Sequence, residues 1–281
     1  MNFAEAFQNA LHKIQDVFGQ REAINILKII GEDLFETYNL KSQKSFSDTQ
    51  KALLDQSITK LLNGTPVQYI TNRADFMGLK LYVDNRVLIP RPETEELVDW
   101  VLYSVDRKNK CKILDVGTGS GCIPIALSVY LTNAFVDAID ISEAALEVAR
   151  INATKNHANI HFINKDILIA IASDFKQKYD IIVSNPPYIS KHETALMGID
   201  VLKSEPHLAL FAGEDPLIFY KKITVLAFEL LEPGGLLYFE LNPVFAQETK
   251  QILQNIGFTE LEIKKDLQSK ERMLKGRKAL T

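Results

Sequence analysis

The chain contains 281 residues, and at roughly 150 residues per domain this length suggests two domains, or one large domain with an appendage. Apolar residues make up 46% of the sequence and charged residues 24%, which are ordinary globular values that exclude disordered, collagen-like and low-complexity chains. Lys and Arg total 32 against 36 Asp and Glu, for a formal charge of −4. This mild acidity argues against a general nucleic-acid coat protein.

Cysteine content and hydropathy bear on the compartment. The chain has only Cys111 and Cys122, too few for a disulfide scaffold or a four-ligand zinc site, so reduced thiols are expected. The first residues mix charged and apolar side chains and lack the apolar stretch of a signal peptide. The longest apolar runs, such as 167–172, are too short to cross a bilayer. We therefore expect a soluble, cytoplasmic protein.

Residues 1–75 are predicted to form a small helical domain. Apolar residues recur every three or four positions from Phe3 to Phe18 and again from Ala23 to Leu34, as on one face of a helix. Ser47 and Gln50 have the spacing of a capping box, which predicts a helix over 48–62. The Asn-Gly pair that follows is a typical helix end.

Residues 76–92 are predicted to be a β-hairpin that links two domains. Apolar residues alternate with other types at Leu79, Leu81 and Val83. Asp84-Asn85 then predicts a turn, and the apolar run 87–89 a second strand.

From residue 93 to 281, strand and helix patterns alternate. Strands are predicted at 112–116, 134–139, 160–163, 179–184 and 235–241, and helices at 120–131, 142–153, 217–231 and 244–255. Residues 258–279 are typical of two strands around a polar turn. The pattern predicts an α/β fold: a Rossmann-like parallel sheet covered by helices on both faces, with an antiparallel edge strand.

A glycine loop follows the first of these strands. The loop consists of Gly117, Thr118, Gly119, Ser120 and Gly121, and its glycines allow a tight turn and close approach of a ligand to the backbone. Asp140 ends the next strand, 23 residues after Gly117, where a carboxylate can accept hydrogen bonds from both hydroxyls of a ribose.

Three ligands and a ligand-free turn compete for this loop. A dinucleotide loop has the pattern G-x-G-x-x-G and a P-loop requires Gly-Lys-Ser/Thr, whereas this loop is G-x-G-x-G. Asp115 at the end of the strand suits a positively charged ligand. The loop resembles the first motif of the S-adenosylmethionine-dependent methyltransferases, and that resemblance implies that residues 117–121 and Asp140 bind this cofactor. The alternative is a tight turn that binds nothing.

Asp166 and Ile167 follow the third strand of the sheet. In such methyltransferases an acidic residue at this place meets the adenine amino group, although a lone Asp before a helix is as often an N-cap. Many relatives have an aromatic residue next, and this chain has Ile167. We therefore expect aliphatic packing against the adenine.

An Asn-Pro-Pro-Tyr motif, residues 185–188, follows the fourth strand, at an edge where open α/β sheets place their chemistry. Pro186 and Pro187 fix the backbone and donate no hydrogen bond, which leaves the Pro186 carbonyl free to accept. The side-chain oxygen of Asn185 is a second acceptor, and Tyr188 offers a flat face for stacking. Two aimed acceptors suit a planar NH₂ group, although a proline-rich loop that only closes a strand has the same composition.

The motif has a chemical rationale. The nitrogen of an amide or exocyclic amine is a poor nucleophile because its lone pair is delocalised. Hydrogen bonds from both N–H groups to Asn185 and Pro186 would orient that lone pair and stabilise the positive charge that develops on nitrogen. We predict Asn185, Pro186 and Tyr188 as catalytic residues and 185–188 as the substrate site, with Asn185 also beside the cofactor.

Several further segments narrow the family. Asn-Pro-Pro-Tyr occurs both in methyltransferases of DNA bases and in those of protein glutamines. The segments that resemble the bacterial release factor glutamine methyltransferases (HemK-like) are 64–70, 87–95, 201–206, 210–213 and 266–277. This resemblance implies a class I methyltransferase fold, S-adenosylmethionine as cofactor, and a release factor as partner. It further implies transfer to N5 of the glutamine in the Gly-Gly-Gln motif of the factor, with residues 1–75 helping to hold it.

Some features stay open or are set aside. Lys203 replaces the usual Arg of this family, and Asn242 replaces a common Gly, while residues 91–95 either line the methionine end of the cofactor or fix the hairpin to the sheet. No His lies at ligand spacing from a Cys or carboxylate, so no metal is expected. Seven cations between 264 and 278 are typical of a protected sheet edge, and we expect no stable nucleic-acid binding. The alternative activities are methylation of a ribosomal-protein glutamine or of adenine N6 in DNA, and the alternative class is a non-catalytic S-adenosylmethionine-binding module.

Overall fold

The computed structural model describes residues 1–37, 39–106, 109–190 and 205–280. The chain divides into two compact units, the first over Met1–Arg73 and the second beginning at Ala74. Val201 to Ser204, part of one family-like segment, lie outside the described residues, as does His192. Within the described ranges, no helix combines the length and apolar character that a membrane crossing requires.

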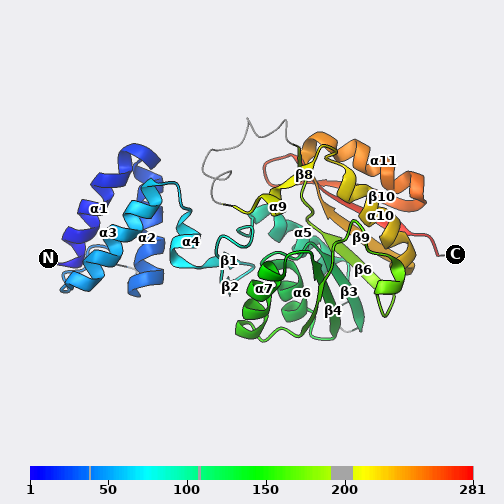
Figure 1. Ribbon diagram of the computed structural model, residues 1–281, viewed down its shortest axis with the longest axis horizontal. Helices are drawn as coiled ribbons and strands as arrows, with labels where there is room; N and C mark the ends of the chain where they lie inside the picture. Colours follow the sequence, from blue (N-terminus) through cyan, green and yellow to red (C-terminus); the bar gives the residue numbers. More distant parts are fainter. Residues whose placement is uncertain (38, 107–108, 191–204, 281) are drawn as a thin grey trace. The chain divides into compact units, whose positions relative to one another are not determined.

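The first unit is helical, as predicted (Figure 1). Its helices are α1 (Phe3–Phe18), α2 (Gln20–Phe35), α3 (Asp48–Leu62) and α4 (Val67–Thr71). Asn2 caps α1 and Ser47 caps α3, each in a capping box, and Gly19 joins α1 to α2 with a φ of 78°. The core is apolar, with a cluster of phenylalanine rings at 3, 7, 35 and 46. Short helices are only marginally stable on their own in water, so the packing of their apolar faces in this core stabilises them.

The second unit opens with a short antiparallel hairpin, β1 (Ala74–Phe76) and β2 (Leu79–Leu81). Met77 and Gly78 form its turn with φ of 51° and 76°, as a tight two-residue hairpin requires. The predicted turn at Asp84-Asn85 is present, since the Val87 N–H donates to the Asp84 carbonyl at 3.1 Å, but the predicted strand at 87–89 is wrong. The Asp84 side chain accepts the Arg86 N–H at 3.0 Å and closes a local turn, and the apolar residues after it are buried without entering a sheet.

Within the described residues, a seven-stranded sheet forms the centre of this unit, in the order β10-β11-β9-β6-β3-β4-β5. The strands from β9 to β5 are parallel, and β11 and β10 add an antiparallel edge, which confirms the predicted fold class. The bounds of these strands are β3 (Cys111–Val116), β4 (Ala134–Asp140), β5 (Ile160–Asn164), β6 (Tyr179–Ser184), β9 (Leu231–Glu240), β10 (Phe258–Lys265) and β11 (Glu271–Lys278).

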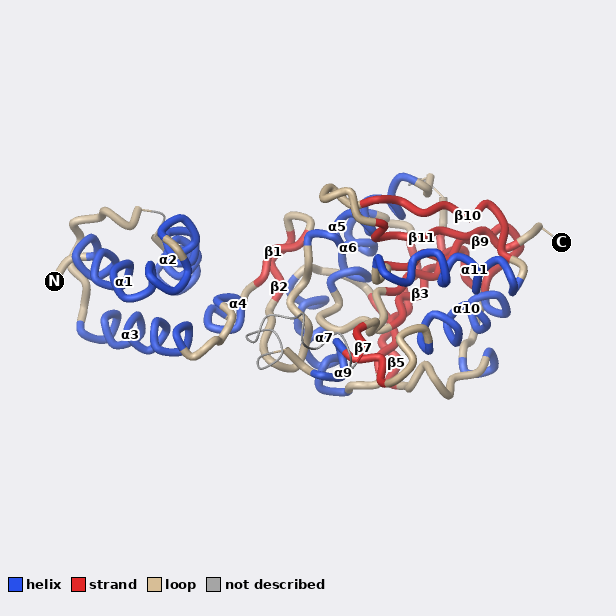
Figure 2. The backbone as a smooth tube through the Cα atoms, turned by 90° about the horizontal axis from the view of Figure 1, so that it is seen from above, coloured by secondary structure: helices blue, strands red, loops and turns tan. Residues whose placement is uncertain are grey.

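Helices cover both faces of the sheet (Figures 1 and 2). Buried residues alternate between the faces: Ile113 and Tyr238 join the core with α5 and α6, whereas Leu114 and Phe239 join the core with α10 and α11. This two-sided burial is typical of a parallel sheet. The helices are α5 (Pro92–Tyr103), α6 (Cys122–Tyr130), α7 (Glu143–Lys155), α9 (His207–Leu210), α10 (Ile218–Leu230) and α11 (Ala246–Ile256). Two short 3₁₀ turns, η1 (Ala172–Asp174) and η3 (Pro243–Phe245), and the pair β7 (Ile189–Ser190) and β8 (Phe211–Gly213) complete the unit.

Candidate active site

The glycine loop needs its glycines. Gly117, Gly119 and Gly121 have φ of 78°, 53° and 82°, a left-handed region that L side chains rarely adopt. A Cβ on Gly121 would also lie 2.9 Å from Ile125 Cδ1 and 3.1 Å from Ala149 Cβ. The backbone N–H groups of Gly117 and Thr118 donate to the Ile139 carbonyl. The loop is thus held against the end of β4.

Asp140 stands at the end of β4 and ties the loop to α7. One carboxylate oxygen accepts the Gly119 N–H at 2.8 Å, and the other accepts the Ser142 N–H at 2.9 Å. Burial raises the pKa of Asp140, and these backbone donors oppose that rise. Each oxygen retains a lone pair, so the carboxylate can still accept from a ligand hydroxyl.

Asp115 near the end of β3 and Thr118 in the loop are buried polar residues. The carboxylate oxygens of Asp115 and the Thr118 hydroxyl accept no hydrogen bond that meets ordinary geometry. Burial raises the pKa of Asp115 to about 7, the Thr118 hydroxyl beside it lowers it, and the Asp140 charge adds to the rise. A buried, unpaired carboxylate is unfavourable unless a cation or donor approaches. This arrangement fits a ligand that carries positive charge next to a ribose.

The predicted adenine residues follow β5. The Asp166 side chain accepts the Leu168 N–H at 2.8 Å, and its carbonyl accepts the Ala170 N–H. The side chain therefore closes a turn, and no helix begins there, so it is not the N-cap of a helix. Ile167 is buried in the core beside α10. An adenine role for either residue remains a prediction.

The Asn-Pro-Pro-Tyr motif lies beside the glycine loop. Strand β6 pairs with β3 so that Ser184 is opposite Val116, and the Ser184 hydroxyl donates to the Val116 carbonyl at 2.7 Å. A Cβ placed on Gly117 would be 3.9 Å from the Asn185 carbonyl oxygen. Two motifs 68 residues apart therefore meet at the carboxyl edge of the sheet.

Asn185 is oriented by residues that sequence reasoning did not single out as site residues. Its side-chain Nδ2 donates to Thr94 Oγ1 at 3.2 Å, and the Thr94 hydroxyl donates to Glu240 Oε2 at 2.6 Å. Glu240 is buried at the end of β9, and burial raises the pKa of its carboxyl group to about 7. Residues 91–95 therefore contact the Asn-Pro-Pro-Tyr motif, through Thr94.

Other residues of the same segment also make fixed contacts. Arg91 donates to both carboxylate oxygens of Glu205 at 2.7 Å, and Glu205 is almost fully buried. Glu95 accepts the Met77 N–H at 2.6 Å, which fastens the hairpin turn to α5. The segment therefore connects the hairpin, the Glu205 region and the catalytic edge.

Tyr188, at the other end of the motif, is held by Asn242, which follows β9. Asn242 donates from Nδ2 to the Tyr188 carbonyl at 3.4 Å, and its backbone N–H donates to the Tyr220 hydroxyl at 3.3 Å. The residue that departs from the family pattern thus supports Tyr188. Burial raises the pKa of Tyr188 to about 12, so its ring is neutral and available for stacking.

Several basic residues of the final strand pair make contacts within the fold. Lys275 pairs with Glu262 at 2.7 Å and Arg277 with Glu260 at 2.8 Å. Lys264 and Lys275 lie 5.6 and 5.1 Å from the Trp100 ring centre, a cation–π geometry. These contacts agree with the edge interpretation. Across the described ranges no cluster of three metal-ligating side chains is present, and the expected absence of a metal stays a prediction.

Comparison with known proteins defines the class. Residues 99–210 match the methyltransferase small domain family. A methyltransferase from Pyrococcus furiosus aligns with a TM-score of 0.54 at 18% identity, over 80% of this chain and 99% of that one. A Thermus thermophilus 16S rRNA methyltransferase, solved with AdoMet and guanosine, aligns with a TM-score of 0.52 at 17% identity, over 73% and 49%. The chain thus has the fold of known methyltransferases and contains a methyltransferase domain.

Full-length relatives define the family. The release factor glutamine methyltransferase of Flavobacterium psychrophilum is 40% identical over 98% of this chain and 97% of the relative. That of Bacteroides thetaiotaomicron is 40% identical over 93% and 95%. The chain belongs to the release factor glutamine methyltransferase family.

Proposed function

We propose that this protein methylates N5 of the glutamine in the Gly-Gly-Gln motif of peptide chain release factors. Membership of the family, at 40% identity over nearly the whole length of a relative, supports this substrate class. The observation that carries the proposal is the hydrogen bonding of the Asn185 side chain. Its NH₂ is tied to Thr94, and within the described ranges no donor reaches its side-chain oxygen or the Pro186 carbonyl.

These two oxygens can perform the acceptor half of the reaction. The target amide donates one N–H to Asn185 Oδ1 and the other to the Pro186 carbonyl. Both bonds turn the nitrogen lone pair toward the methyl donor and stabilise the developing positive charge. The Tyr188 ring stacks on the amide plane. The protonated product amide is a strong acid that loses its proton to water, so no dedicated general base is needed.

The cofactor half lies across β3 and β4. Bound S-adenosylmethionine supplies an electrophilic methyl group to this site. Residues 117–121 would face it through their backbone, Asp140 would accept from its ribose hydroxyls, and Asp166 and Ile167 would meet its adenine. The unpartnered carboxylate of Asp115 gives the region a negative potential that suits the sulfonium and ammonium groups.

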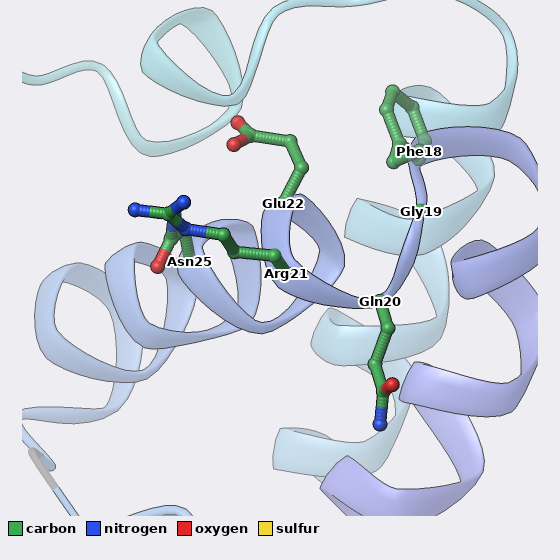
Figure 3. Close-up of a pocket in the computed structure, with 6 residues that line it drawn as sticks. All are labelled: Phe18, Gly19, Gln20, Arg21, Glu22 and Asn25. Atoms are coloured by element: carbon green, nitrogen blue, oxygen red, sulfur yellow. The ribbon is translucent and has the colours of Figure 1, made fainter.

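The helical unit, residues 1–73, is proposed as a docking domain for the release factor. Its core is separate from the two cores of the second unit. The hollow between α1 and α2 is lined by Phe18, Gly19, Gln20, Arg21, Glu22 and Asn25. Figure 3 shows Gln20 and Arg21 pointing in different directions rather than toward one point. Such a lining does not resemble a small-molecule site, in which polar groups converge.

The same two acceptors also suit a planar amine on a nucleobase, or the glutamine of a ribosomal protein. The internal contacts of the C-terminal cations favour a protein acceptor over nucleic acid. A cytoplasmic location belongs to the proposal, because release factors act on ribosomes.

Labelled S-adenosylmethionine tests the proposal directly. The protein is incubated with release factor, ribosomal protein and duplex DNA in separate reactions. We expect label in the release factor. Label that appears only in DNA or only in the ribosomal protein would overturn the proposed substrate.

A further inference from the structure

A buried chain of hydrogen bonds runs from β9 through α5 to the Asn-Pro-Pro-Tyr motif. Glu240 and Thr94 each expose only 2% of their surface. The hydroxyl of Thr94 lies 2.6 Å from Glu240 Oε2 and 3.2 Å from Asn185 Nδ2. The three residues come from three distant segments, with 146 positions between Thr94 and Glu240. The fold therefore joins a carboxylate, a hydroxyl and an amide in one chain of hydrogen bonds.

The number of protons fixes the direction of this chain. A hydroxyl has one proton to donate, and the short contact to a carboxylate is the stronger of the two hydrogen bonds. Thr94 therefore donates to Glu240 and can only accept from Asn185. An Asn side chain that must donate on this side presents NH₂ to Thr94 and turns its oxygen away. The orientation of the amide, which shape alone does not determine, thus follows from the proton on Thr94.

We propose that Thr94 and Glu240 are positioning residues that fix the side-chain amide of Asn185 with its oxygen toward the acceptor substrate. The proposal rests on the proposed function, in which that oxygen accepts an N–H of the target amide. With the amide turned over, NH₂ would face the N–H groups of the target and the site would lose an acceptor. Neither Thr94 nor Glu240 touches the reacting atoms in this account.

The first test removes the hydroxyl and keeps the volume. Thr94→Val should lower the single-turnover rate of methyl transfer by about tenfold to a hundredfold, the effect of losing one orienting hydrogen bond. The dissociation constant for S-adenosylmethionine and the KM for the acceptor should stay within about twofold. Thr94→Ser restores the hydroxyl and should recover most of the rate. A purely structural role would lower binding and stability together with the rate.

A matched control is available in α11. Thr249 is also a fully buried threonine, and its hydroxyl donates to the Phe245 carbonyl at 2.8 Å, away from the chain of bonds. Thr249→Val should leave the transfer rate unchanged at a comparable loss of stability. Equal rate losses in Thr94→Val and Thr249→Val, or no loss in Thr94→Val, would overturn the proposal.

The second test uses pH. When Glu240 is protonated it can donate to Thr94, whose proton is then free to point at Asn185 and turn the amide over. The transfer rate should therefore rise with pH as Glu240 loses its proton, and Glu240→Gln should abolish that rise. The groups that act on the charge of Glu240 are Thr94, Arg91 and Glu93 from the α5 segment and Arg272 from β11. The charge of Glu240 in turn acts on Tyr188, Tyr220 and Cys122.

The proposed function and the positioning role of Thr94 and Glu240 can be tested separately. The acceptor that the wild-type protein labels decides the proposed function, and the variants are then measured on that acceptor, whichever it is. As a readout besides activity, the side-chain NH₂ of Asn185 in ¹⁵N-labelled protein should shift its resonances in Thr94→Val and not in Thr249→Val. Unshifted resonances, or a pH profile in Glu240→Gln identical to the wild type, would contradict the positioning role.

Discussion

The two units of the chain differ in how many polar and charged side chains they bury. Of the buried polar and charged residues among the described ranges, Ser57 alone lies in the helical unit, and the rest, including Asp115, Glu205 and Glu240, lie in the α/β unit. The helical unit is held by apolar packing and phenylalanine contacts. Burial of carboxylates is unfavourable unless function or pairing requires it. This difference agrees with the proposals that the second unit performs the chemistry and that the first binds the release factor.

The largest effect is expected at Asn185, the proposed binding site of the acceptor in the α/β unit. Asn185→Ala removes one acceptor, while Pro186 and Pro187 still set the backbone. The transfer rate should fall by about 10²–10³-fold, by analogy with the loss of one charge-stabilising hydrogen bond, and cofactor affinity should barely change. Single-turnover assays with calorimetry measure both.

Asn185→Asp sharpens this expectation. A carboxylate at position 185 has no proton to donate to Thr94, whose own proton goes to Glu240. The carboxylate therefore loses its fixed orientation and lies near the negative charge of Glu240. We expect Asp to be nearly as slow as Ala. A rate equal to or above the wild type would show that acceptor charge alone matters.

Asp140 tests the cofactor half of the same unit. Asp140→Ala removes the expected ribose acceptor and also the anchor of the Gly119 and Ser142 N–H groups. Cofactor affinity should fall by roughly tenfold to a hundredfold, or about 1.5–3 kcal/mol. Unchanged affinity by calorimetry would reject the assignment.

Removal of residues 1–73 tests the other side of the comparison. The α/β unit retains both of its cores, so cofactor binding should persist. The KM for folded release factor should rise about tenfold, which corresponds to ~1.4 kcal/mol of lost binding. A truncated protein that methylates the factor as efficiently as the full chain would remove the docking role.

The smallest effect is a change in stability at Asp115. Its folded pKa of about 7 lies above the ordinary value of 3.8, so the folded state binds the proton more tightly and stability falls as pH rises from about 4 to 7. Asp115→Asn should lose this decline and melt higher than the wild type at pH 8 without cofactor. It should also bind S-adenosylmethionine more weakly. A wild-type protein of equal or higher melting temperature at pH 8 would contradict the account.

Local patterns predicted much of this fold from sequence. The helix at Asp48–Leu62 and the strand at Tyr179–Ser184 begin and end where predicted, because capping residues and two-sided burial leave clear signals. The hairpin was misplaced because Met77-Gly78 is a weak turn signal, whereas Asp84-Asn85 is a strong one. A turn forms at Asp84-Asn85, but no strand follows it.

The site was predicted in part. Gly117 to Gly121, Asp140 and Asn185 were proposed from motif and spacing, and the structure places them at one edge of the sheet. Thr94 and Glu240 were missed as site residues, since their contact with each other and with Asn185 joins segments 91 and 146 positions apart. A buried Thr in the first turn of a helix has the ordinary interpretation of a packing residue. Only the three-dimensional structure shows that Thr94 contacts both Glu240 and Asn185.

The position of the transferred methyl group decides whether the glutamine of the Gly-Gly-Gln motif is the substrate. Release factor methylated by this protein is digested and fragmented in a mass spectrometer, beside a factor whose Gly-Gly-Gln glutamine has been replaced by alanine. The account predicts a single methyl group on the side chain of that glutamine and none on the replaced factor. Equal methylation of both factors, at any other residue, would contradict it.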